Sequence, residues 1–154
     1  MDTADLKALV KSIVVKANTL KNKHTSEKEA FVNYACIFSQ SKEKYEELLE
    51  AAGKMGKIIK ETPTGPLFHI EPLETGSGTL RILKIRAPDL TRPEEGDADF
   101  TVSGFSAFQE KYLTRPGFKL IEREKFVMIE LMDPTFSVRA YFSNPPLDRQ
   151  LNIG

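Results

Sequence analysis

Hydrophobic positions recur with two different periods along the chain, and the change of period marks the expected strands and helices. In residues 97–103, Ala98, Phe100 and Val102 alternate with polar residues, and this period of two predicts a half-buried strand. In residues 105–113 apolar side chains return every three or four positions, as they do along one face of a helix. A strand followed directly by a helix is therefore expected in this region.

Three further segments after this helix are rich in β-branched and aromatic residues, which favours strands at residues 118–122, 126–132 and 138–143. Asp133 and Pro134 supply a turn before the last of them. The second half of the chain is therefore predicted to run strand, helix, strand, strand, strand.

The same order of elements is expected once before. Residues 31–38 read FVNYACIF, which favours a strand, although residues 27–55 as a whole also fit one long helix. The polar residues 39–41 interrupt the pattern and can cap a helix over residues 42–52. Three strands are then predicted, at residues 57–61, 66–73 and 79–86.

Comparison of the two halves supports an internal repeat. ACIFS aligns with DFTVS, which places Ala35 over Asp99, and the pair Ile70-Glu71 falls against Ile129-Glu130. We divide the chain into an N-terminal helix with its linker, a first module, a linker rich in proline and charge, and a second module with the tail. The boundaries are 1–25, 26–89, 90–96 and 97–154, within one compact domain.

The N-terminal region carries an apolar stripe at helical spacing, which includes Leu6, Val10, Ile13 and Ala17. A docked helix carries such a face, so we expect this helix to pack as a brace on the sheet. The tail, residues 144–154, is turn-prone and is expected to dock loosely or fray.

Paired βαβββ modules resemble the vicinal oxygen chelate superfamily, which includes glyoxalases, extradiol dioxygenases and bleomycin-resistance proteins. The resemblance covers residues 32–144 and depends on the order of the elements and on the repeat. It implies an α+β fold in which the paired βαβββ modules form a curved mixed sheet around a cavity. It also implies a divalent metal, which active members hold with His or Glu from the first and last strands of each module.

The residues at these implied metal positions are mostly of other types: Tyr34 or Ala35, Lys84, Asp99, and Ala140 or Tyr141. Only Asp99 is an ordinary metal ligand, and a cation held by one carboxylate beside a lysine would bind weakly. We therefore expect no metal of the family type and no cofactor.

A relocated site on the third strands is the alternative. His69 and Glu71 share one face of their strand, as Glu130 does with its neighbours. If these faces look into the cavity, the three residues converge with Asp99 as a divalent metal site or as a general acid and base pair. The competing explanation is that each faces water or pairs with an arginine, such as Arg81, Arg123 or Arg139, as polar residues on alternating strands most often do.

Arginine side chains supply a further kind of candidate. Arg86, Arg92 and Arg139 can bind a carboxylate or phosphate by paired hydrogen bonds, whereas scattered arginines are usually solvated or paired with acids. Cys36 lies among apolar residues and is expected to be a buried packing residue rather than a nucleophile. The candidate ligand-binding set is His69, Glu71, Asp99, Glu130, Arg139 and Tyr141.

Charge and cysteine content narrow the function classes. Lys and Arg together number 22, as do Asp and Glu, so no net field would recruit nucleic acid or an anionic membrane. Cys36 is the single cysteine and cannot form an internal disulfide, and the N-terminal region lacks an uninterrupted apolar stretch. We expect a cytoplasmic protein without nucleic-acid or membrane partners. The sequence leaves open whether the protein forms a homodimer.

Three functions remain as hypotheses. The first is binding of a small organic molecule in the cavity between the modules, without a metal of the family type. The second is a metal-dependent lyase, isomerase or dioxygenase that uses the relocated His and Glu site. The third is a non-catalytic interaction or scaffold protein whose sheet is closed by packing, and an apolar pocket of ligand size would favour the first hypothesis over the third.

Overall fold

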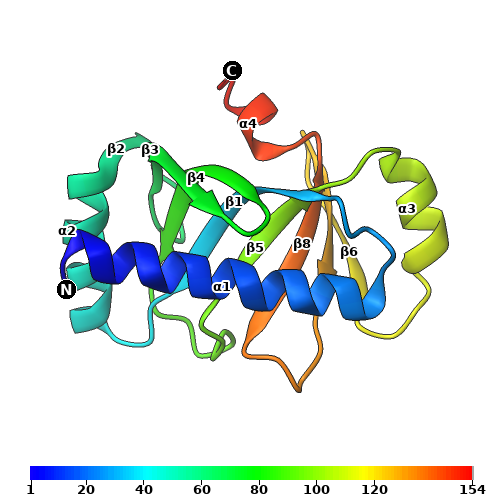
Figure 1. The fold of residues 1–154 in the computed structure, drawn as a ribbon, viewed down its shortest axis with the longest axis horizontal. Helices are drawn as coiled ribbons and strands as arrows, with labels where there is room; N and C mark the ends of the chain where they lie inside the picture. Colours follow the sequence, from blue (N-terminus) through cyan, green and yellow to red (C-terminus); the bar gives the residue numbers. More distant parts are fainter. Residues whose placement is uncertain (154) are drawn as a thin grey trace.

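The computed structural model describes residues 1–153, and only Gly154, the last residue of the second module, lies outside the described part. One sheet of eight strands is covered by helices on one face (Figure 1). Helix α1 (Thr3–His24) runs across the middle of this face, with α2 (Lys42–Met55) at one end and α3 (Phe105–Tyr112) at the other. A short helix, α4 (Leu147–Gln150), lies near the C-terminus, where the sequence suggested only turns.

Each half of the chain contributes four strands. The first half contains β1 (Phe31–Phe38), β2 (Gly56–Lys60), β3 (Leu67–Thr75) and β4 (Gly78–Arg86). The second half contains β5 (Gly96–Thr101), β6 (Phe118–Glu122), β7 (Val127–Leu131) and β8 (Val138–Asn144). The order across the sheet is β2-β3-β4-β1-β5-β8-β7-β6, so each half runs outward from the centre as first, last, third and second strand. This arrangement confirms the predicted α+β fold of paired βαβββ modules.

The two halves meet where β1 and β5 pair in antiparallel fashion, with Ala35 opposite Ala98. Each of these strands pairs in parallel on its other side, β1 with β4 and β5 with β8. The prediction of a strand over residues 31–38 is therefore confirmed, and the competing long helix is wrong. The Ser41 side chain accepts a hydrogen bond from the Lys44 amide at 3.1 Å, which caps α2 after the break that the sequence indicated.

The strand register corrects one detail of the repeat. Ala35 packs in the core beneath the helices, as do Ala98 and Phe100. Asp99 lies between the latter two, so it points to the opposite face of the sheet. The alignment of Ala35 with Asp99 is therefore off by one residue, and Tyr34, which pairs with Asp99 across the centre, shares its face.

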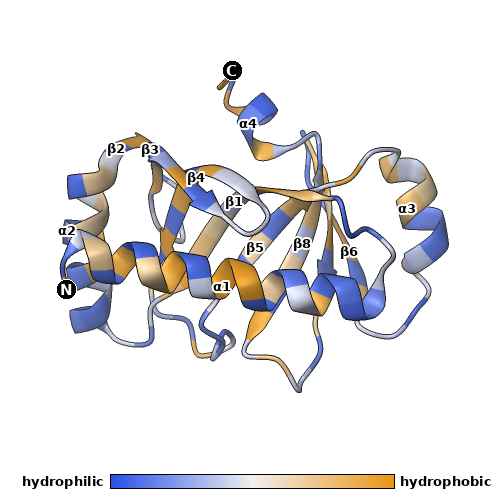
Figure 2. Ribbon diagram, viewed as in Figure 1, coloured by the Kyte–Doolittle hydropathy of each residue, from blue (hydrophilic) through white to orange (hydrophobic). Residues whose placement is uncertain are grey.

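Helix α1 is the predicted brace. The side chains of its apolar stripe are completely buried against the sheet and α2; they are Leu6, Val10, Ile13, Val14, Ala17 and Leu20. Hydrophobic and hydrophilic residues alternate around α1 in Figure 2. Within residues 1–153, no helix has the length and apolar character required to cross a membrane.

Strand β5 differs from the half-buried strand that its alternation predicted. Ala98 and Phe100 are fully buried on the helix side, and Asp97 and Asp99 on the other side are only 5% and 0% exposed. Both faces are covered because β5 lies at the centre of the sheet. The alternation therefore marks two buried faces of different polarity, and the polar one forms part of the site described below.

Candidate functional site

The face of the sheet opposite the helices borders a cavity of about 530 Å³. Both halves of the chain line it: Tyr34, Cys36, Thr62, Pro63, Thr64, Lys84 and Arg86 from the first, and Arg92, Asp97, Ile121, Arg123, Phe126, Met128 and Tyr141 from the linker and the second. Eight strands in a flat sheet would span roughly 34 Å, since neighbouring strands lie about 4.8 Å apart. Residues from near both edges border one cavity because the sheet curves.

A row of polar side chains crosses the four central strands on the cavity side. Cys36 of β1 pairs with Lys84 of β4 on one side and with Asp97 of β5 on the other. Asp97 in turn pairs with Arg139 of β8. Residues paired directly across strands share a face, so these four side chains lie side by side.

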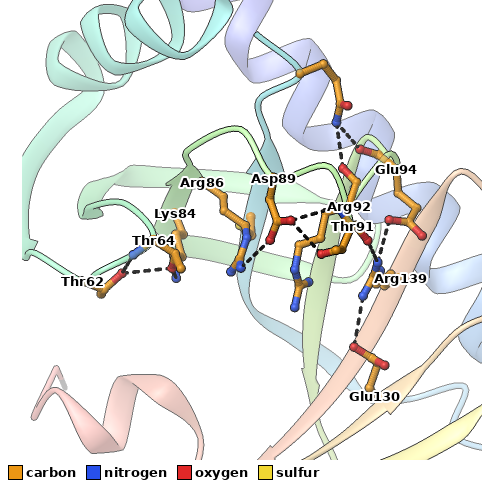
Figure 3. Close-up of polar contacts among 12 residues, drawn as sticks. Thr62, Thr64, Lys84, Arg86, Asp89, Thr91, Arg92, Glu94, Glu130 and Arg139 are labelled. Atoms are coloured by element: carbon orange, nitrogen blue, oxygen red, sulfur yellow. Dashed lines mark hydrogen bonds and ion pairs between the residues drawn. The ribbon is translucent and has the colours of Figure 1, made fainter. Parts of the chain in front are cut away.

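Three cationic side chains lie together on one wall of the cavity (Figure 3). Lys84 Nζ donates a hydrogen bond to the Thr64 hydroxyl at 2.7 Å, and Arg92 Nη1 donates to Tyr141 Oη at 3.1 Å. Arg86 Nη2 lies 3.3 Å from a carboxylate oxygen of Asp89, while its Nε is buried without an acceptor. Lys84 and Arg92 form no direct ion pair within residues 1–153, and the acid nearest to them on the cavity wall is Asp97.

Asp97 is the one carboxylic acid on the cavity wall among the described residues. Its Oδ1 is buried and has no hydrogen-bond partner. Burial raises the pKa of Asp97 to about 7, against the opposing effect of the nearby cations Arg92, Lys84 and Arg86. Burial also lowers the pKa of Lys84. The wall therefore carries an acid that can change its charge near neutral pH.

Asp99, a predicted site residue, lies deeper than Asp97 and does not border the cavity. The Ser143 hydroxyl donates to its Oδ2, and its Oδ1 has no partner. Burial raises the pKa of Asp99 to about 8 although the hydrogen bond from Ser143 opposes the rise. Asp99 is therefore a buried acid beside the cavity rather than a residue on its wall.

The predicted residues Glu130, Arg139 and Tyr141 are brought together in one network. Tyr141 Oη donates to Glu130 Oε2 at 2.5 Å, and burial raises the pKa of Tyr141. Arg139 Nη1 lies 3.3 Å from the same Glu130 oxygen, and Arg139 Nη2 lies 3.0 Å from Glu94. Two carboxylates thus balance the charge of Arg139. This arginine therefore has a structural role beside the cavity.

His69 and Glu71 do not join the other predicted residues. Both side chains are exposed on β3, where they border a separate, open depression with Lys57. Four strands separate β3 from β7, which carries Glu130. Within residues 1–153, no three His, Cys, Asp or Glu side chains are grouped as metal ligands. The predicted convergence fails because alternation fixes the face of each residue, whereas the strand order fixes its distance from the centre.

The side chains at the positions that the family resemblance assigns to metal ligands are also unsuited to binding a metal. Burial raises the pKa of Tyr34, so its phenol stays protonated, and Asp99 has a pKa of about 8. Lys84 brings an ammonium group to the same face, with Arg92 nearby. Divalent metals require several deprotonated oxygen, nitrogen or sulfur ligands, so these residues do not fit one.

Sequence reasoning missed Asp97 and did not separate Arg86 and Arg92 from surface arginines. Asp97 could have been found from its position on the same polar face of the strand as Asp99. The alternation alone predicts that this face is exposed to solvent. The position of Arg92 depends on the linker, because the Gln40 side chain donates to the carbonyl groups of Arg92 at 3.1 Å and Glu94 at 2.9 Å. No local pattern predicts a contact across about fifty residues.

No family model matches the chain, and no curated protein does. A solved structure described as "Structural Genomics, Protein EC4020" is similar over 97% of this chain and 91% of that one. Its TM-score is 0.74 and its sequence identity is 12%. This likeness shows that the two chains share a fold.

Two further solved structures are less similar. One is a glyoxalase/bleomycin resistance protein/dioxygenase superfamily member from Vibrio splendidus 12B01, with a TM-score of 0.48, 8% identity, and coverage of 74% of this chain and 97% of that one. The other is a mutant of 4-hydroxymandelate synthase from Streptomyces coelicolor, with a TM-score of 0.38, 13% identity, and coverage of 77% and 50%. With TM-scores below 0.5, neither likeness bears on the function of this chain.

Proposed function

We propose that the cavity binds a small organic acid and holds its carboxylate or phosphate group between Lys84, Arg86 and Arg92, without a divalent metal. The observation that carries this proposal is the set of three cations on one cavity wall, of which Lys84 and Arg92 have no ion-pair partner within residues 1–153. Burial of an unpaired charge costs free energy, and a bound anion would offset that cost.

The geometry of the donors suits an anionic group. A guanidinium presents several N–H donors in a planar fork that matches carboxylate and phosphate oxygens. The Lys84 ammonium has the neutral hydroxyl of Thr64 as its partner, and Arg92 donates to the neutral phenol of Tyr141. Each of these groups therefore retains donor capacity for a ligand.

The remaining wall indicates the rest of the ligand. The second half of the chain also contributes apolar side chains to the cavity wall, namely Ile121, Phe126 and Met128. This apolar surface suits a short hydrocarbon chain. The volume of about 530 Å³ lies in the range of small-molecule sites, roughly 300–1,000 Å³. A cavity of this size favours ligand binding over a scaffold closed by packing, although its lining is more charged than the apolar pocket expected from the sequence.

Calorimetric titration with hexanoate tests the proposal, with neutral hexanamide as the matched probe. Hexanoate should bind and hexanamide should not. Lys84→Met and Arg92→Met should each weaken hexanoate binding about tenfold, which corresponds to ~1.4 kcal/mol. Lys7→Met, at an exposed position of α1, serves as the control and should leave the affinity unchanged. Equal binding of the amide, or indifference to both cavity substitutions, would contradict the proposal.

A second titration separates this proposal from the metal-dependent alternative. Zn²⁺ and Mn²⁺ added to metal-free protein should leave the unfolding midpoint unchanged, because a ligand that does not bind the folded state cannot stabilise it. A metal-induced rise in the midpoint that Asp99→Ala or Glu130→Ala removes would favour the alternative instead.

A further inference from the structure

Asp97 borders the cavity, and its carboxylate accepts no hydrogen bond from residues 1–153. The residue is 5% exposed, and its Oδ1 has no hydrogen-bond partner. A buried polar atom left unpaired costs about 1–3 kcal/mol, more if it is charged. Because Oδ1 is covered by the protein, a ligand in the cavity reaches the carboxylate through its other oxygen, Oδ2, which accepts no hydrogen bond from residues 1–153.

The neighbours of Asp97 explain why the acceptor stays free. Cys36, its partner on β1, directs its thiol to the Ile37 carbonyl oxygen at 3.8 Å. Arg139, its partner on β8, directs its two terminal nitrogens to Glu130, Glu94 and the Thr91 carbonyl. The thiol of Cys36 and the two terminal nitrogens of Arg139 are therefore engaged elsewhere, and Arg139 Nε is buried without a partner, so none of these groups donates to Asp97.

Asp97 lies close to the cations assigned to the anion. Lys84 and Asp97 pair with the same residue of β1, so their side chains enter the cavity at one level of the sheet. Arg86 and Arg92 border the same cavity. A ligand atom that contacts Asp97 is thus near the acid group of the ligand rather than at the far end of its hydrocarbon chain.

We infer, on the basis of the proposed function, that the ligand is a hydroxy acid whose hydroxyl group, on the carbon next to the acid group, donates a hydrogen bond to Asp97. A hydroxyl fits better than an ammonium group because four cations, Lys84, Arg86, Arg92 and Arg123, line the cavity against one acid. They would repel a second positive charge, whereas a hydroxyl is neutral. The cavity thereby distinguishes hydroxy acids from amino acids and from simple acids.

Three six-carbon probes with the same chain test this inference: hexanoate, 2-hydroxyhexanoate and 2-aminohexanoate. At pH 8, where Asp97 with a pKa of about 7 is mostly ionised, 2-hydroxyhexanoate should bind about tenfold more tightly than hexanoate, as a hydrogen bond to a charged acceptor allows. The amino compound should bind most weakly. The comparison uses the unmodified protein, so it does not depend on the folding of a variant.

Two substitutions assign the preference to one carboxyl group. Asp97→Ala should bring 2-hydroxyhexanoate and hexanoate to equal affinity while hexanoate still binds. Asp99→Ala is the matched control, because Asp99 lies on the same face of β5 but does not border the cavity, and the preference should persist.

The outcomes separate this inference from the proposed function. If hexanoate binds and the hydroxyl gives no advantage, or if Asp97→Ala leaves the advantage in place, the inference is wrong and the proposed anion site stands. Tighter binding of 2-aminohexanoate than of 2-hydroxyhexanoate also overturns the assignment of a hydroxyl. If none of the three probes binds, the proposed function itself is wrong.

Discussion

Asp97 and Lys84 lie at the same level of the sheet, two strands apart, because each pairs with Cys36 of β1. Burial shifts the pKa of both groups toward their neutral forms, upward for Asp97 and downward for Lys84. The charge of the cavity wall therefore changes with pH near neutrality, and ligand binding should follow this change.

The affinity for hexanoate should rise as the pH falls from 8 to 6, by up to about tenfold. Protonation of Asp97, whose pKa is about 7, removes a negative charge beside the bound carboxylate. Titration calorimetry at three pH values measures the effect. Asp97→Asn should bind hexanoate with little dependence on pH, and an equally steep dependence in this variant would exclude Asp97 as the cause.

Other charged groups act on Asp97 from the strands and loop around it. They are Lys84, Arg86, Arg92, Arg139 and Asp99. The arginines keep their charge over this range. Asp99, with a pKa of about 8, contributes less to ligand binding because it does not border the cavity.

Asp99→Asn should stabilise the protein in alkaline solution. The folded-state pKa of Asp99 is about 8, above the ordinary value of 3.8, so the folded protein holds this proton more tightly than the unfolded chain does. Its contribution to stability is therefore complete below pH 4 and is lost as the pH rises to 8. The free energy of unfolding in urea should increase by on the order of 3 kcal/mol at pH 9 and change little at pH 3, below the unfolded-state pKa. A variant no more stable than the original protein at pH 9 would contradict this account.

Helix α1 provides a test of the packing that supports the site. Ile13 is completely buried, whereas Val15, two residues further along the helix, is 55% exposed. Ile13→Ala should lower the free energy of unfolding by about 2–4 kcal/mol through lost burial and a residual cavity, and Val15→Ala should change it by less than about 0.5 kcal/mol. Similar losses for the two variants would argue against the docked helix.

Gly96 tests the close approach of the two halves. A Cβ at this position would lie 2.1 Å from the Cys36 carbonyl oxygen, which belongs to the backbone and cannot move aside. Gly96→Ala should therefore cost about 2 kcal/mol or more. Gly53→Ala, inside α2 with no atom within 4 Å of the new Cβ, should instead stabilise the protein by about 0.5–1 kcal/mol. Both changes are read from thermal or urea unfolding.

The sequence predicted the fold well because periodicity and turn residues are local signals. The alternation in β5, the aromatic and β-branched residues of β1, and the stripe of α1 each identified an element near its observed bounds. The one-residue error in the repeat, which matched Ala35 with Asp99, shows the limit of such signals. Strand register is set by pairing between strands distant in sequence, and a single-residue shift reverses the face of every side chain.

The candidate site was predicted less completely, and for a physical reason. Glu130, Arg139 and Tyr141 were proposed as ligand-binding residues; in the structure they contact one another, and Glu130 and Arg139 form an ion pair. His69 lies in the other half of the sheet from Glu130, because the strand order places β3 next to the edge strand β2. Asp97 was overlooked since a polar residue on an alternating strand normally faces water, and the burial of this face depends on the curvature of the whole sheet.

The most direct test of the anion site is a crystal structure of the protein with bound 2-hydroxyhexanoate. The account predicts that the carboxylate lies within hydrogen-bond distance, about 3 Å, of the side chains of Lys84 and at least one of Arg86 and Arg92, with the butyl chain toward Met128. A carboxylate bound elsewhere, or a ligand in the cavity with its carboxylate directed away from these three cations, would contradict it.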